Sequence, residues 1–279
     1  MKKKLVILNL LLVQVALFGI YSCDMFTTKN KKETVASEPG KQQPSRAEAL
    51  TYDLTSFKKR SKVCDSGDKQ CAEVVVQYPY FQQSNASFIN SIIEKKVKTA
   101  LHETVFNDEV PNVSVEKMAD MVIEDYESFI DEFQDSSEKW DISVSVVSTF
   151  QKNQLLSLSF STESYTGGAH ANSFIEYMIL DLKNEQELKV GDLVSSKKQL
   201  NTVAERLFRK QKNLSAAQSL QEEGYFFEGG KFKISDNIGI QQNGLVIYFN
   251  SYEIAPYAMG PSAVIVPFYE IKDILKIKY

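Results

Sequence analysis

WDISVSVVSTFQKNQLLSLSF, residues 140–160, contains two runs in which apolar and polar side chains alternate. An alternation with period two predicts a β-strand that turns one face to the core and the other to water. The stretch therefore predicts two strands of a half-buried antiparallel sheet. Its inward-facing residues are Trp140, Ile142, Val144 and Val146 in the first run, and Leu156, Leu158 and Phe160 in the second.

Further strands are expected downstream of this stretch. Residues 174–180 and 264–266 predict two of them, and residues 238–240 and 245–249 predict a hairpin around Gln242-Asn243-Gly244. Asn-Gly favours such a turn because both residues tolerate positive φ. Residues 198–209 and 269–276 predict helices.

Helices dominate the chain before residue 140. AEVVVQ, residues 72–77, predicts a strand that ends at Pro79. A helix is expected from about residue 86 to residue 105 with Asn85 as its cap, and a second helix after Ser114. The acidic outer face of the second helix, Glu124 to Glu132, is interpreted as solvated charge. Long helices followed by strands predict the α+β class, with helices packed on an antiparallel sheet in two small tandem subdomains, residues 51–165 and 166–279.

The N-terminus predicts export and lipidation. Three lysines precede an apolar run from Leu5 to Ile20, which is shorter than the ~20 apolar residues that span a bilayer. The run leads to Gly19-Ile20-Tyr21-Ser22-Cys23, which resembles the bacterial lipobox. We expect a lipoprotein signal peptide over residues 1–22, acyl chains on Cys23 that anchor the chain to a membrane, and a disordered polar tether over residues 23–50. An uncleaved signal anchor is the alternative.

Composition narrows the remaining function classes. The 279-residue chain is 43% hydrophobic and 24% charged, which is ordinary for a globular protein. Its net charge of −4 argues against nucleic acid as a partner, since nucleic-acid binding needs a concentrated basic face. In an exported chain, the pair Cys64 and Cys71 predicts a disulfide. A redox or metal pair is the weaker interpretation, because the spacing is not C-x-x-C and no His is near.

Two segments combine residues in an unusual way. Tyr165-Thr166-Gly167-Gly168-Ala169-His170-Ala171-Asn172 joins two predicted strands, and Tyr252-Glu253-Ile254-Ala255-Pro256-Tyr257-Ala258-Met259-Gly260 precedes the last one. Together they resemble the RsiV/PdaC-type extracellular domains. These domains form the ectodomain of lysozyme-sensing anti-sigma factors and the non-catalytic N-terminal part of peptidoglycan deacetylases. The resemblance covers the chain from about Tyr52 to its C-terminus.

Departures from both groups limit what the resemblance implies. An anti-sigma factor needs a cytoplasmic segment before its membrane span, and only four residues precede the apolar run, so no sigma-factor partner is expected. The deacetylases need a catalytic domain with metal-binding His and Asp, whereas this chain has two His residues, His102 and His170. The resemblance therefore implies the sensing or binding domain alone, on a lipid anchor and facing the periplasm or the exterior.

Each candidate residue has a structural and a functional interpretation. Glycines free the backbone for a tight turn, His170 hydrogen-bonds within the fold or contacts a ligand, and the tyrosines pack in turns or line a groove. A metal at His170 ranks last, because no partner has ligand spacing, and we expect neither a metal nor a cofactor. The candidate ligand-binding residues are Tyr165, Thr166, Gly167, Gly168, His170, Asn172, Tyr252 and Tyr257.

The sequence favours a non-catalytic envelope module that binds a lysozyme-like hydrolase or cell-wall glycan. Neither a G-x-S-x-G elbow nor an H-E-x-x-H zinc motif occurs in the chain. An enzyme acting on peptidoglycan or another envelope glycan, through paired carboxylates, remains an alternative. A structural envelope scaffold is another.

Overall fold

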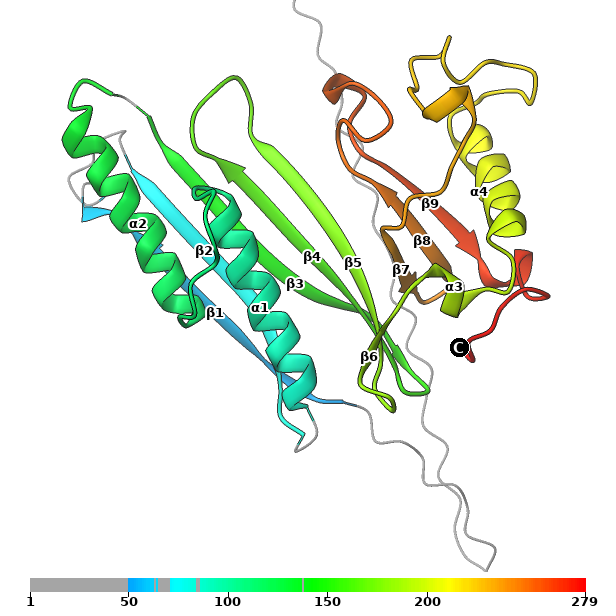
Figure 1. Cartoon of the computed structure of the whole chain (residues 1–279), viewed down its shortest axis with the longest axis horizontal. Coiled ribbons are helices and arrows are strands. Elements are labelled where there is room, and N and C mark those ends of the chain that lie inside the picture. The colour runs from blue at the N-terminus through cyan, green and yellow to red at the C-terminus, as the bar shows by residue number, and fades with distance from the viewer. Residues whose placement is uncertain (1–49, 63, 65–70, 84–85, 137) are drawn as a thin grey trace, which may run out of the picture. The chain divides into compact units, whose positions relative to one another are not determined.

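The computed structural model describes residues 50–62, 64, 71–83, 86–136 and 138–279, all of which belong to one compact unit, Arg46–Tyr279. The α+β class predicted from the sequence is confirmed. A six-stranded sheet carries helices α1 (Ser87–Glu103) and α2 (Val115–Glu132), and a three-stranded antiparallel sheet packs with α4 (Lys197–Gln211) (Figure 1).

The larger sheet has its strands in chain order, β1-β2-β3-β4-β5-β6. Its strands are β1 (Tyr52–Arg60), β2 (Ala72–Phe81), β3 (Trp140–Lys152), β4 (Leu155–Tyr165), β5 (Asn172–Asp181) and β6 (Gln186–Leu188). Neighbours are antiparallel, as expected, except that β2 and β3 run parallel, with Ala72 opposite Trp140. Parallel neighbours need a long crossover, and α1 and α2 supply it.

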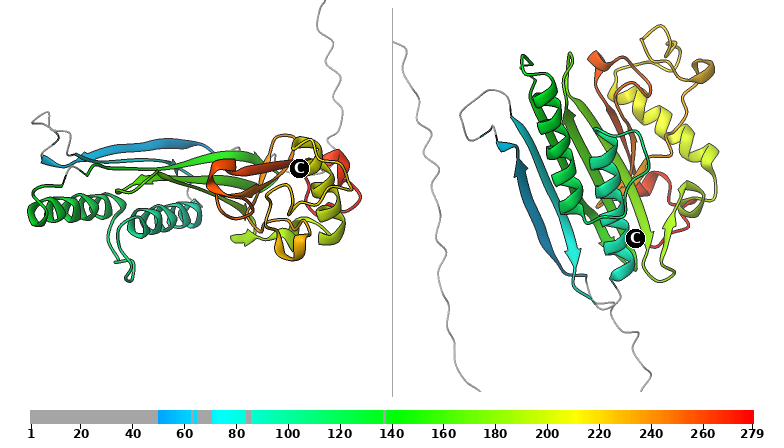
Figure 2. Two further views of the ribbon diagram at one scale, coloured as in Figure 1. Left: turned by 90° about the horizontal axis from the view of Figure 1, so that it is seen from above. Right: turned by 60° about the vertical axis from the view of Figure 1, so that its left-hand side comes forward.

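Both helices cover the same face of the sheet, as the view from above shows (Figure 2). The alternation predicted for β3 holds, since Trp140, Ile142, Val144 and Val146 are all buried. Ser114 caps α2 by accepting a hydrogen bond from the backbone N–H of Lys117 at 3.1 Å. The first core is therefore formed by the inward-facing residues of the sheet, which recur with period 2, and the inward-facing residues of the two helices, which recur with period 3.6.

The smaller sheet consists of β7 (Ile238–Gln241), β8 (Gly244–Phe249) and β9 (Ser262–Pro267). The predicted hairpin is present, but its turn residues are Gln242 and Asn243, and neither they nor Gly244 has positive φ. Gly244 is required for another reason. A Cβ at this position would overlap the backbone carbonyl of Val266 on β9. The glycine therefore permits close strand pairing.

Several local predictions were wrong. Residues 269–276 do not form a helix, because only the short 3₁₀ helix η4 (Phe268–Glu270) is present there, followed by turns. Pro79 does not end β2, which continues to Phe81 and pairs with β1 opposite Leu54. The short elements β6 and α3 (Val190–Leu193) were not predicted.

The expected boundary between residues 165 and 166 falls between β4 and β5, which are neighbours in the larger sheet. The division into two tandem subdomains stays a prediction. The expected signal peptide, the tether up to residue 49, Cys23 and the Asn85 cap lie outside the described residues. Within the described ranges, no helix is long and apolar enough to cross a membrane.

The predicted disulfide between Cys64 and Cys71 is present, with the two Cα atoms 4.8 Å apart. It lies between β1 and β2. The backbone N–H of Ser61 donates to Ala72 O at 3.0 Å, and Cys71 O accepts from the N–H of Trp140 at 3.1 Å. The bridge therefore closes the connection between two strands that already belong to one sheet.

Candidate functional site

The two unusual segments of the sequence meet in space. His170, in the loop between β4 and β5, stacks on Tyr257, in the loop between β8 and β9, with ring centroids 3.8 Å apart and planes inclined by 12°. The hydroxyl of Tyr252 lies 3.3 Å from His170 Nε2. We call His170, Tyr252 and Tyr257 the Tyr–His cluster. It is open to solvent, with 59% of Tyr252 exposed.

Hydrogen bonds to one carbonyl orient the rings of the cluster. Ala171 O accepts from the Tyr257 hydroxyl at 3.0 Å and lies 3.2 Å from His170 Nδ1. A carbonyl can only accept, so a neutral imidazole in this position carries its proton on Nδ1. Nε2 then accepts, and the Tyr252 hydroxyl donates to it. The cluster thus presents an aromatic face with a defined set of polar atoms.

Glycines shape the first loop. Gly167 and Gly168 have φ of 107° and 95°, which is unfavourable for residues that carry a Cβ. A Cβ on Gly167 would also overlap the carboxylate of Glu138, which precedes β3. The hydroxyl of Tyr165 donates to Gly168 O at 3.0 Å and closes the loop. Tyr165, Gly167 and Gly168 therefore have a demonstrable structural role.

The second loop is fixed to the outer edge of β5 by Asn250, which is 4% exposed. Asn250 Oδ1 accepts from the backbone N–H of Ile175 at 2.7 Å, and its Nδ2 donates to Ile175 O at 3.0 Å. Asn237 continues the pattern, because it accepts from the N–H of Tyr177 at 2.7 Å and donates to Ile175 O at 2.6 Å. The two amide side chains thus make the hydrogen bonds to β5 that a neighbouring strand would otherwise make.

Tyr252 has an unusual backbone conformation. Its φ is 68°, in the left-handed region that bulky residues seldom adopt. The contact between its hydroxyl and His170 and the anchoring of Asn250 two residues earlier accompany this conformation. Strain of this kind is stable only where the surroundings hold it, and it concentrates at functional positions.

The other candidates are placed differently. Thr166 is half-buried in the loop, and Asn172 is exposed at the start of β5. His102 is buried in α1, with Nε2 3.0 Å from a carboxylate oxygen of Asp108. Among the described residues, no group of three or more His, Cys, Asp or Glu side chains is arranged to hold a metal ion. The sequence did not indicate Asn237 or Asn250, because their role depends on pairing with a distant strand.

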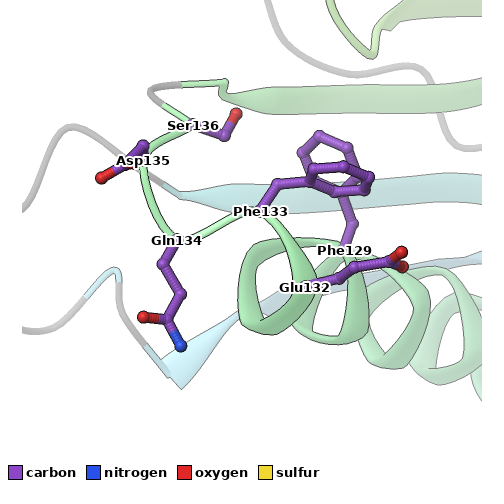
Figure 3. Close-up of a pocket in the computed structure, with 6 residues that line it drawn as sticks. All are labelled: Phe129, Glu132, Phe133, Gln134, Asp135 and Ser136. Atoms are coloured by element: carbon purple, nitrogen blue, oxygen red, sulfur yellow. The ribbon is translucent and has the colours of Figure 1, made fainter.

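An open depression lies at the C-terminal end of α2 (Figure 3). The rings of Phe129 and Phe133 lie together there, with centroids 5.1 Å apart, and 51% of Phe133 is exposed. The lining also includes the carboxylates Glu132 and Asp135, and the last turn of α2 has no basic residue. The negative end of the helix dipole adds to this charge, so the depression favours a cation.

Two segments of the chain match two different protein families. Residues 66–173 match the family described as Deacetylase PdaC, and residues 188–269 match the family described as protein of unknown function DUF3298. The chain thus has a PdaC domain followed by a DUF3298 domain. His170 lies in the first match, and Tyr252 and Tyr257 lie in the second, so the Tyr–His cluster needs both.

A curated relative is the peptidoglycan-N-acetylmuramic acid deacetylase PdaC of Bacillus subtilis, which is 20% identical over 191 residues. The match covers 66% of this chain but 40% of that protein, so the chain spans less than half of the relative's length. The relationship is therefore distant and does not extend to the whole enzyme.

Two solved structures share the fold. A DUF3298 family member from Bacteroides fragilis superposes with a TM-score of 0.66 at 19% identity, covering 83% of this chain and 95% of that one. A DUF3298 family protein from Pseudomonas aeruginosa PAO1 gives 0.58 at 15% identity, covering 82% and 95%. At these identities the likeness establishes the fold alone.

Proposed function

We propose that this chain is a membrane-anchored, extracytoplasmic module that binds cell-wall glycan at the Tyr–His cluster without cleaving it. The observation that carries the proposal is the stack of the exposed His170 on the half-buried Tyr257, with the exposed Tyr252 beside it. Aromatic faces next to fixed hydroxyl and imidazole groups suit a sugar, which has an apolar ring face and polar edges.

Two further observations support the compartment and the ligand class. The match to the PdaC family and the distant relative named as a peptidoglycan deacetylase point to the cell wall. The Cys64–Cys71 disulfide suits an oxidising compartment outside the cytoplasm. The proposed anchor is a lipid on Cys23, which follows from the lipobox-like sequence.

Co-sedimentation of the purified full chain with peptidoglycan sacculi tests the proposal. We expect the protein to pellet with the sacculi and the supernatant to contain neither acetate nor sugar fragments. Release of either product would show that the chain is an enzyme. Protein that stays in the supernatant would overturn glycan binding and favour a scaffold role.

The acidic surface of α2 supports a second candidate, a basic, lysozyme-like hydrolase as protein partner. α2 has seven acidic residues and one basic residue, and the exposed ring of Phe133 lies at its acidic C-terminal end. Three of the seven, Asp120, Glu124 and Glu127, form ion pairs with lysines, so the unbalanced charge lies mainly at that end. Opposite charge accelerates encounter and sets orientation, and exposed aromatic rings serve as interface anchors.

Titration of the full chain with lysozyme at two salt concentrations tests this candidate. We expect binding that weakens with salt and is reduced in Phe133→Ala, with Phe174→Ala, another exposed phenylalanine, as the matched control. Absence of binding at low salt would remove the candidate, and it would leave the glycan proposal unaffected.

A further inference from the structure

Ser173 lies at an open position on the outer edge of β5, the edge that faces away from β4. The backbone groups of Ile175 and Tyr177 point away from β4, as their bonds to side chains show. Asn250 binds both the N–H and the C=O of Ile175, and Asn237 accepts from the N–H of Tyr177. Just before the strand, Ala171 O accepts a hydrogen bond from the Tyr257 hydroxyl. Every second residue of an antiparallel strand points to the same side, so Ser173 also directs its N–H and C=O outward.

These two groups of Ser173 are available to a ligand. Ser173 is exposed, and none of the side-chain or loop hydrogen bonds found within the described ranges involves its backbone or its hydroxyl. The position is bounded on both sides, by Tyr257 at Ala171 and by Asn250 at Ile175. A full β-strand therefore cannot pair along this part of the edge, whereas a single polar group can bond to Ser173.

The flanking residues define the chemistry of that group. In place of water, an exposed N–H bonds more strongly to an amide carbonyl than to a hydroxyl oxygen, and an exposed C=O accepts from a donor such as a hydroxyl. The loop that bounds Ser173 also contains Tyr252, whose exposed ring suits the face of a sugar. A sugar with an acetamido group and a nearby hydroxyl combines these features, whereas a sugar with hydroxyls alone lacks the amide carbonyl.

We infer that Ser173 selects N-acetylated sugars: its backbone N–H donates to the acetamido carbonyl of a ring that lies at the Tyr–His cluster. The inference rests on the proposed function, since it specifies the ligand class of the same site. It makes the backbone of β5, rather than a side chain, responsible for specificity.

The test compares two neutral tetrasaccharides that differ in the acetamido group, chitotetraose and cellotetraose. We expect the full chain to bind chitotetraose about tenfold more tightly, as one neutral hydrogen bond at the upper end of its range would give. Ser173→Ala keeps the backbone N–H and should keep this ratio. Ser173→Pro removes the N–H at an edge position, where proline is tolerated, and should bring the ratio to about one.

A second measurement does not depend on a variant. In the wild-type protein, the amide resonance of Ser173 should shift with chitotetraose and not with cellotetraose. Equal affinity for the two tetrasaccharides, a ratio that survives in folded Ser173→Pro, or an unmoved Ser173 resonance would overturn the inference while glycan binding stands. If the chain binds neither of the two tetrasaccharides and does not pellet with sacculi, the proposed function itself is overturned.

Discussion

The imidazole of His170 lies against the ring of Tyr257, with centroids 3.8 Å apart and planes 12° from parallel. This contact joins a loop of the larger sheet to a loop of the smaller one. It explains why two segments far apart in the sequence each carry aromatic and polar residues in a loop. The segments build one surface, and neither is complete alone.

Tyr257→Phe and Tyr257→Ala should separate the two contributions of this side chain. Phe keeps the stack on His170 and loses the bond to Ala171 O, so we expect a loss of about 1 kcal/mol in unfolding free energy. Ala also loses the stack, so it should destabilise more and weaken glycan binding. Urea unfolding and sacculi co-sedimentation measure the two effects. Equal behaviour of both variants would contradict a role for the stack.

Asn250→Ala should destabilise the fold by about 1–3 kcal/mol, because it leaves the N–H of Ile175 unpaired where Asn250 was buried. Asn237→Ala should have a similar effect through Tyr177. Asn172→Ala, an exposed control on the same strand, should change the unfolding free energy by less than about 0.5 kcal/mol. If all three variants unfold at the same urea concentration, the amide side chains do not hold the loop on β5.

Replacing Cys64 and Cys71 together by Ser should lower the unfolding free energy by about 2–3 kcal/mol, since the bridge restricts a short loop in the unfolded chain. Mass spectrometry after alkylation checks the premise. Freshly isolated, undenatured protein should incorporate no alkylating agent at these two residues. Two alkylated thiols would show that the protein does not form the bond.

Stability in acid should depend on Glu127. Hydrogen bonds from the side chain and the backbone N–H of Lys62 hold the pKa of Glu127 below its ordinary value. The folded pKa is depressed, so the contribution is present above the unfolded pKa and is lost as the pH falls through the folded one. Glu127→Gln should therefore lose less stability than wild type over that acid range. Thermal unfolding between pH 6 and pH 2 measures this, and parallel curves would refute the pairing.

Cys23→Ser should release the protein from the membrane fraction or leave it unprocessed, because the variant has no thiol to acylate. Radiolabelled fatty acid should enter the wild type and not the variant. Equal labelling of both proteins would show that the anchor is elsewhere.

Periodicity predicted the regular elements of the fold well. The alternation from Trp140 to Val146 appears as β3, and Ser114 caps α2 as its position suggested. The parallel pairing of β2 with β3 was not predicted, because a sequence pattern shows which face of a strand is buried but not the direction of its neighbour. Gly244 was attributed to a turn, although the approach of Val266 explains it.

The candidate site was predicted in parts. His170, Tyr252 and Tyr257 were singled out within separate motifs, and their contact depends on tertiary structure. The sequence around Asn237 and Asn250 did not indicate their role. An asparagine whose side chain bonds to the edge of a strand cannot be distinguished in the sequence from an ordinary loop residue. The open backbone of Ser173 likewise depends on which neighbours pair with β5.

The most direct test of glycan binding compares two exposed tyrosines in one co-sedimentation series with peptidoglycan sacculi. Tyr252 belongs to the Tyr–His cluster, and Tyr269 is 72% exposed beyond the opposite end of β9. We predict that Tyr252→Ala lowers the affinity about tenfold or more, since the aromatic face of Tyr252 and its hydrogen bond to His170 are lost together, whereas Tyr269→Ala binds as wild type. Equal affinity of all three proteins would contradict the assignment of the glycan site to the cluster.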